Sequence, residues 1–143
     1  MDTIKAPNCI DDNPEVIKKL ILKWYEKTIS KIHKRYSKKI AMLNSEISKL
    51  DRMKENGDDI NALDPYYYEL DKCEDALVAL KTSTMCIINN SIREVEKTTY
   101  SLSAFNSVVG HLQLAFHNFK VRINLIQIPN VEEKMNKSVK RKR

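Results

Sequence analysis

The sequence predicts an all-α protein in which two long amphipathic helices form an antiparallel coiled-coil hairpin. Glycine occurs 2 times and proline 4 times among 143 residues, which is about 4% together against roughly 12% in average proteins. Sheet-rich folds need both residues at their turns, so this composition disfavours them. Apolar side chains also recur at steps of three and four residues along most of the chain, and this is the period of an α-helix.

The first predicted helix covers residues 14–56, after a lead at 1–13. Pro14 suits the first helical position, and Gly57 supplies a stop just past the end. Trp24 lies beside the main apolar stripe, which widens the apolar face near the start and indicates more than one neighbour there. The expected packing positions form heptads: Leu22, Tyr25, Ile29, Ile32, Tyr36, Ile40, Leu43, Ile47 and Leu50.

A turn at 57–64 leads to the second predicted helix, which covers residues 65–128. Its apolar positions step by threes and fours throughout, and no proline interrupts it. Residues 89–91 and 97–99 are weak helix formers, and either stretch could hold a kink or break. The alternative fold is therefore a compact three- or four-helix bundle, in which this stretch breaks near residue 90.

The unequal lengths of the two predicted helices locate a binding surface. The first helix can cover only about residues 65–107 of the second, so residues 108–128 are left without an intramolecular partner, although they are the most apolar part of the chain. A fully buried large apolar side chain contributes ~1.5–3 kcal/mol, so we expect this segment to pack on another protein. The predicted partner-binding residues are Val109, Leu112, Phe116, Phe119, Ile123 and Ile126, together with Trp24 of the first helix.

Charge is separated along the chain. Residues 15–41 carry nine Lys or Arg side chains against two glutamates, whereas residues 42–75 are acidic. The basic stripe can contact phosphates or an acidic polymer such as the surface of a microtubule, although it also suits the solvated outer face of a coiled coil. Residues 129–143 form a basic tail that resembles a nuclear-localisation or polyanion-binding segment. The candidate polyanion-binding residues are Lys27, Lys31, Lys34, Arg35, Lys38, Lys39, Lys140, Arg141, Lys142 and Arg143.

The sequence offers little for catalysis, so we expect no enzyme, no cofactor and no bound metal. His33, His111 and His117 lack the spacing of metal ligands on one helical face, and no nucleophile motif or phosphate-binding loop is visible. No apolar run is long enough for a membrane span, and no signal peptide is recognisable, so we expect no integral membrane association. Three widely spaced cysteines indicate reduced thiols in the cytoplasm, the nucleus or both.

These features favour a non-catalytic coiled-coil subunit of a multi-subunit intracellular assembly. The basic stripe favours a cytoskeletal or spindle setting, of the microtubule or kinetochore type, with partner helices bound through residues 108–128. We expect a hetero-oligomer with other helical subunits in preference to a homodimer. The alternatives are a polyanion- or nucleic-acid-binding helical protein, and a compact helical adaptor or subunit of a vesicle-trafficking complex.

Overall fold

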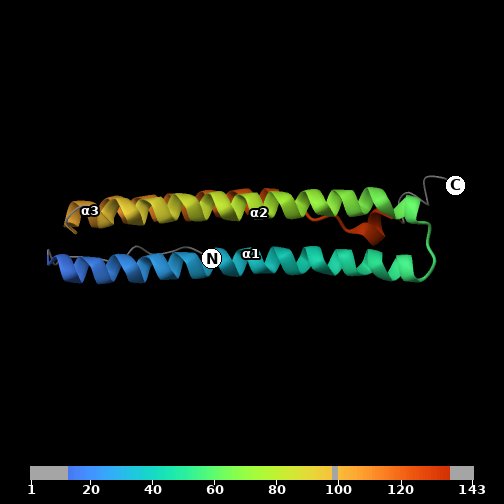
Figure 1. The fold of residues 1–143 in the computed structure, drawn as a ribbon, viewed down its shortest axis with the longest axis horizontal. Helices are drawn as coiled ribbons and strands as arrows, with labels where there is room; N and C mark the ends of the chain where they lie inside the picture. Colours follow the sequence, from blue (N-terminus) through green and yellow to red (C-terminus); the bar gives the residue numbers. More distant parts are fainter. Residues whose placement is uncertain (1–12, 98–99, 136–143) are drawn as a thin grey trace.

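The computed structural model describes residues 13–97 and 100–135 and contains three long helices. These are α1 (Pro14–Glu55), α2 (Ile60–Glu96) and α3 (Leu102–Leu125). Helix α2 runs antiparallel to α1, and α3 turns back along both, parallel to α1 (Figure 1). The all-α prediction is confirmed. The two-helix hairpin is not, because the helices pack as a three-helix bundle.

The turn between α1 and α2 is fixed by a glycine after the end of α1. Gly57 has a φ of 90°, which is a left-handed conformation that side chains disfavour. The N–H of Gly57 donates to the Lys54 carbonyl at 3.2 Å, and the N–H of Asp58 donates to the Met53 carbonyl at 3.1 Å. This pair of bonds is the Schellman arrangement, which satisfies the last carbonyls of the helix and reverses the chain.

Helix α2 begins five residues before the predicted start at residue 65. The carboxylate of Asp59 accepts a hydrogen bond from the Asn61 N–H at 3.0 Å and so caps the helix at this earlier position. Pro65 lies inside the helix, where it leaves only the carbonyl of Asn61 without its usual donor, on an exposed turn. The extension brings Leu63 into the core, where its side chain is 1% exposed.

In place of the predicted single helix at 65–128, the chain changes direction between α2 and α3. Helix α2 ends at the C-cap Lys97, and α3 starts after Ser101, whose hydroxyl accepts a hydrogen bond from the Ala104 N–H at 3.1 Å. Serine is a favoured N-cap because it satisfies an N–H group that has no partner inside the helix. The change of direction lies at the second of the two weak stretches, and not near residue 90.

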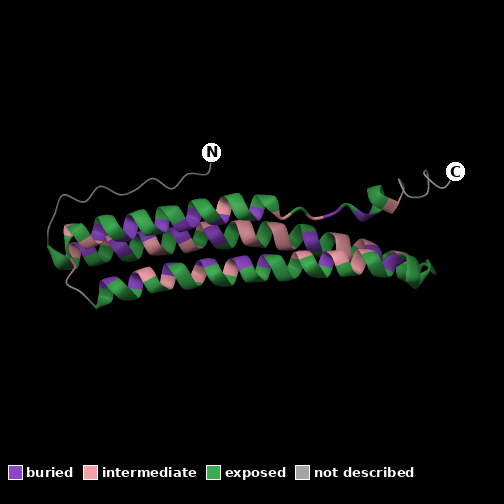
Figure 2. Cartoon of the chain, turned by 90° about the horizontal axis from the view of Figure 1, so that it is seen from above, coloured by how far each residue is buried: buried purple, intermediate pink, exposed green. Residues whose placement is uncertain are grey.

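This change of direction buries the apolar segment that the hairpin would have left uncovered. The predicted partner-binding residues Val109, Leu112, Phe116, Phe119, Ile123 and Trp24 are all at most 6% exposed, and Ile126 is partly buried against the same core. They pack between the three helices, so the reason for assigning them to another protein no longer holds. Buried positions recur along each helix (Figure 2).

The chain continues past α3 as a C-terminal strap, residues 126–135, which lies along the hinge half of α1 and α2 (Figure 1). Val131 is fully buried, and its N–H donates to a Glu46 carboxylate oxygen at 3.1 Å. The Nζ of Lys134 lies 2.7 Å from a Glu69 carboxylate oxygen. The described part of the predicted tail at 129–143 therefore packs on the bundle, whereas Lys140, Arg141, Lys142 and Arg143 lie outside the described residues.

Replacement of a core residue of α3 tests this packing. Phe119→Ala should lower the free energy of unfolding by about 3–5 kcal/mol, because it leaves a cavity between the helices. Leu125→Ala, at a position that is 74% exposed on the same helix, should change it by less than about 0.5 kcal/mol. Urea denaturation followed by the fluorescence of Trp24, the single tryptophan, measures both. Equal effects of the two substitutions would contradict the three-helix core.

A second prediction concerns the strap. Val131→Ala should loosen it and speed amide hydrogen exchange in residues 40–55 and 60–75, while exchange in α3 stays unchanged, because only the hinge half loses cover. Glu132→Ala, at the exposed neighbouring position, is the matched control and should leave exchange as in the wild type. Mass-spectrometric exchange measures all three segments. Identical patterns for the two variants would show that the strap does not protect the hinge half.

Candidate functional site

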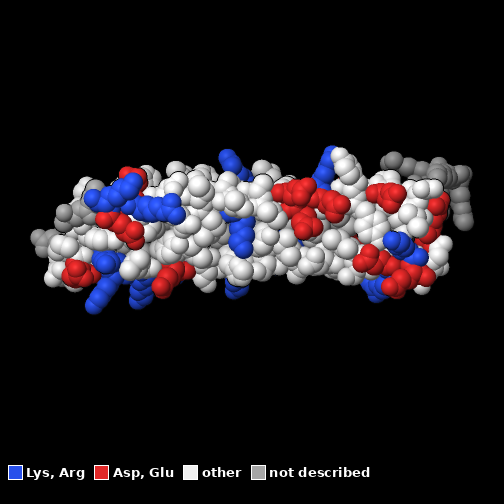
Figure 3. Space-filling model, viewed as in Figure 1, with Lys and Arg blue, Asp and Glu red and all other residues white. Residues whose placement is uncertain are grey.

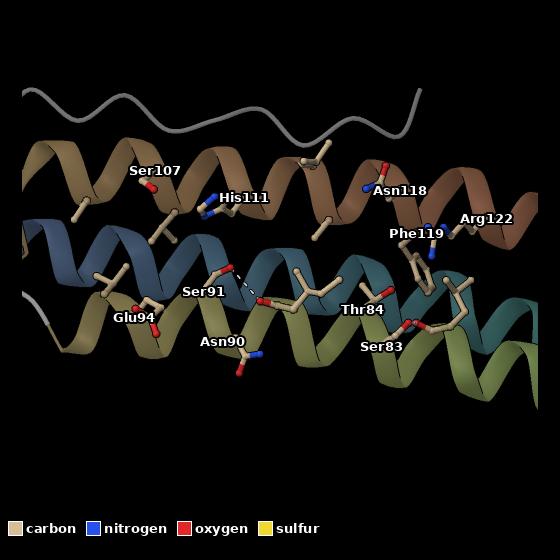
Figure 4. Close-up of a pocket in the computed structure, with 17 residues that line it drawn as sticks. Ser83, Thr84, Asn90, Ser91, Glu94, Ser107, His111, Asn118, Phe119 and Arg122 are labelled. Carbon is tan, nitrogen blue, oxygen red and sulfur yellow. Dashed lines mark hydrogen bonds between the residues drawn. The ribbon is translucent and has the colours of Figure 1, made fainter.

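A groove of about 690 Å³ lies between α2 and α3, and no residue of α1 lines it. Its walls follow helical spacing: Thr84, Ile87 and Ser91 face it from α2, and His111 and Leu114 face it from α3. Figure 4 shows the labelled side chains of the two helices converging on this space. The groove therefore lies between α2 and α3, and its lining includes core residues such as Val108 and Phe119.

Small side chains keep the groove open. Ser83, Ser91, Ala104, Ser107 and Ala115 take the places at which larger side chains would fill the space between the helices. The hydroxyl of Ser91 donates to the Ile87 carbonyl at 3.0 Å (Figure 4), and that of Ser83 donates to the Leu80 carbonyl at 3.1 Å. These two serines are satisfied within their own helix, so the floor of the groove is less polar than its residue types indicate.

Two large apolar side chains stand exposed on the walls near the middle of the groove. Ile87 is 55% exposed and Leu114 is 58% exposed, whereas Val108 and Phe119 beneath them are at most 2% exposed. Exposed single apolar residues are common on protein surfaces, but these two line opposite walls of a groove whose lining also includes buried apolar residues. This combination is typical of a site for an apolar helix face.

Opposite charges mark the two ends of the groove. Glu94 lies at one end, beside the turn between α2 and α3, and Arg122 lies at the other (Figure 4). The Glu94 carboxylate is 3.8 Å from the Lys97 Nζ, but both side chains are more than 70% exposed. Such an exposed pair contributes about 0–1 kcal/mol, so it leaves Glu94 able to exchange partners.

The structure divides the predicted basic stripe into two groups. Lys27, Lys34 and Lys38 are exposed on α1, where they remain candidates for polyanion binding, while Lys31 is half-buried. Two further members contact the chain itself. The Nζ of Lys39 donates to the Ile126 carbonyl at 2.8 Å, and the guanidinium of Arg35 lies 5.9 Å from the centre of the Phe116 ring.

The charge separation of the sequence persists in the folded chain. Figure 3 shows acidic side chains gathered over the hinge half of one face, with basic and acidic side chains mixed at the opposite end. Helix α3 carries two basic side chains, Lys120 and Arg122, and no acidic one. The groove-lining segments, 80–95 of α2 and 104–122 of α3, together carry four basic side chains and one acidic one, so they are more basic than the hinge half of the bundle.

Ile87 is a functional candidate that the sequence prediction missed, whereas Leu114 lies inside the predicted binding segment 108–128 but not among the residues predicted to bind. Both lie outside the three-and-four repeat that marks the core. A usable signal was the composition of α3, in which Leu114, Val121 and Leu125 add exposed apolar side chains to an already apolar helix. A helix with apolar residues on most of its circumference needs more neighbours than one stripe can contact.

The titratable groups with displaced pKa values take part in packing. Partial burial raises the pKa of the Cys73 thiol, which lies 3.5 Å from the Gln127 carbonyl of the strap. Partial burial and a 2.6 Å hydrogen bond from the Tyr67 hydroxyl to the Asp51 carboxylate raise the pKa of Tyr67 to about 12. Both groups stay protonated near neutral pH, so neither is activated as a nucleophile.

Within residues 13–97 and 100–135, no group of three or more His, Cys, Asp and Glu side chains is placed to hold a metal ion. The helices of this part of the chain include none that is long and apolar enough to cross a bilayer. Comparison with known proteins finds no relative: no protein-family model, no curated protein and no solved structure matches the chain. The groove is thus interpreted from its own geometry and charge.

Proposed function

We propose that the chain is a non-catalytic helical interaction module, a subunit of a larger assembly that binds partner helices in the groove between α2 and α3. The observation that carries this proposal is the pair Ile87 and Leu114, exposed on facing walls above a buried apolar floor. This proposal places the partner-binding surface on the groove side of α2 and α3, and not on the core stripe of residues 108–128 that the sequence predicted.

The groove has the dimensions that helix docking requires. Its lining spans Leu80 to Val95 on α2 and Ala104 to Arg122 on α3, which corresponds to a length of roughly 22–27 Å. An amphipathic helix of about 15–18 residues fills this length and would complete a four-helix arrangement. Large side chains on one face of that helix would enter the space that the serines and alanines leave open.

The energetics support a small set of anchoring contacts. Burying the exposed parts of Ile87 and Leu114 contributes on the order of 1–2 kcal/mol for each side chain. This contribution concentrates in the middle of the groove, where anchoring residues are usually found, while Glu94 and Arg122 at the ends select partners by charge. The cytoskeletal or spindle setting stays a prediction, supported by the exposed lysines of α1.

Site-specific photocrosslinking tests the proposal. A photoreactive phenylalanine analogue at position 114, in chain expressed in its native cells, should form covalent adducts with bound protein, because this position faces the groove. The same analogue at Val121, which is 47% exposed on α3 but outside the groove, is the matched control and should form few. Equal yields at the two positions, or no adducts at either, would contradict groove binding.

Deletion of residues 108–128 would not test binding in the groove. The segment contains Leu112, Phe119 and Ile123, which are all at most 2% exposed. Its removal would expose the core of α1 and α2 and would therefore change stability together with binding. Substitutions on the groove walls separate the two effects, because the wall side chains contribute little to the core.

A further inference from the structure

We infer that the helices received by the groove are α2 and α3 of a second copy of this chain, arranged antiparallel about a twofold axis. The inference rests on the proposed function, since it names the partner of the same groove. It differs from the sequence-based expectation of a hetero-oligomer. Two apolar side chains, Ile87 and Leu114, and two charged ones, Glu94 and Arg122, support this arrangement by their positions in the groove.

Contacts to α1 set the register of α2 against α3. The Tyr25 hydroxyl donates to the Asn89 side chain of α2 at 2.8 Å, and Arg35 of α1 lies 5.9 Å from the Phe116 ring of α3. Counting along α1 from these two levels places Ile87 and Leu114 about 9 Å from each other along the bundle axis. The two apolar anchors therefore lie on either side of one centre.

The two charges lie at nearly equal distances from that centre. Glu94 follows Ile87 by seven residues on α2, about 10 Å, and Arg122 follows Leu114 by eight residues on α3, about 12 Å. Since α2 and α3 are antiparallel, these offsets point in opposite directions. The groove thus carries a negative charge and a positive charge placed almost symmetrically about its apolar middle.

A twofold axis through the centre and perpendicular to the helices makes this surface self-complementary. The rotation exchanges the two ends of the groove, so Glu94 of each copy lies at the same end as the Arg122 side chain of the other copy. Ile87 of one copy then lies level with the second copy's Leu114, and both leave water. Each contact occurs twice, as it must in an isologous dimer.

The same charges disfavour the parallel arrangement. With a twofold axis along the helices, each end of one copy's groove would lie against the same end of the other copy's groove. The two Glu94 side chains would then meet at one end and the two Arg122 side chains at the other. Like charges in contact disfavour such a complex. Charge complementarity therefore selects the antiparallel dimer.

The size of the face sets the expected affinity. A strip of two helices about 20 Å wide and about 30 Å long offers roughly 600 Å² per copy, or about 1,200 Å² in total. This lies at the lower end of specific interfaces. The dimer should therefore dissociate at low concentration and form in the micromolar range or above.

Charge reversal measured by sedimentation equilibrium tests the inference at physiological ionic strength. Glu94→Arg alone and Arg122→Glu alone should each weaken self-association roughly tenfold or more, because each places like charges at both ends. The double variant Glu94→Arg/Arg122→Glu should restore it, since the charges match again. Leu114→Glu should abolish the dimer, and Val121→Glu, outside the groove, should keep it. Circular dichroism confirms that each variant is folded.

The possible results of these measurements support or overturn the second-copy arrangement as follows. Association of the wild type with rescue by the double variant supports the second-copy arrangement. A wild-type chain that stays monomeric up to submillimolar concentration, or a double variant that is as weak as the single ones, overturns it. If the chain is monomeric but position 114 still forms adducts with a different protein, the proposed function stands and only the identity of the partner is wrong. If position 114 forms no adducts and the chain is monomeric, both fail.

Discussion

Burial of the apolar stripe of α3 is the constraint on which the rest of the molecule depends. Leu112, Phe119 and Ile123 cannot be covered by a two-helix hairpin, because α1 is too short to reach them if the chain continues straight. The change of direction before Ser101 brings α3 back along α1, so that these side chains join the core that also contains Trp24. With its inner stripe buried, α3 is left with an outer face that only α2 adjoins, and this face becomes one wall of the groove.

The strap completes the bundle in the half that α3 does not reach. Residues 127–130 have no regular secondary structure, and a short helical segment follows at 131–135. Its first residue, Val131, is buried and its N–H donates to Glu46, whose carboxylate lies 2.9 Å from the Lys49 Nζ. Helix α1 consequently has a second neighbour besides α2 along most of its length, first α3 and then the strap. The side of α2 and α3 away from α1 has no such cover within the described residues. This arrangement leaves the groove between them as the surface for a partner.

Helix type, the ends of α1 and most of the core could be predicted from the sequence, because they depend on local pattern. The start of α2 at Ile60 could not, and Leu22 is 37% exposed although its spacing marks it as a packing position. The repeat that includes Phe105, Phe116 and Phe119 marked core positions correctly, since burial follows period whichever helix covers it. The apolar spacing did not locate the direction change, because the three-and-four repeat runs through residues 97–101 as if the helix continued. Only the weak helix formers at 97–99 marked one of two possible breaks. The groove residues Ile87 and Leu114 depend on which neighbours α2 and α3 acquire, so local spacing could not identify them either.

The return of α3 along α1 can be measured directly by electron–electron resonance between two spin labels. Cysteines at the exposed positions Lys38 of α1 and Asn124 of α3, in a chain whose three native cysteines are replaced, carry the labels. Neighbouring helices in the bundle place the labels within about 30 Å of each other. An extended second helix at 65–128 would place them about 60 Å apart. A distance distribution below about 30 Å is the predicted result, and one centred near 60 Å would contradict the three-helix account.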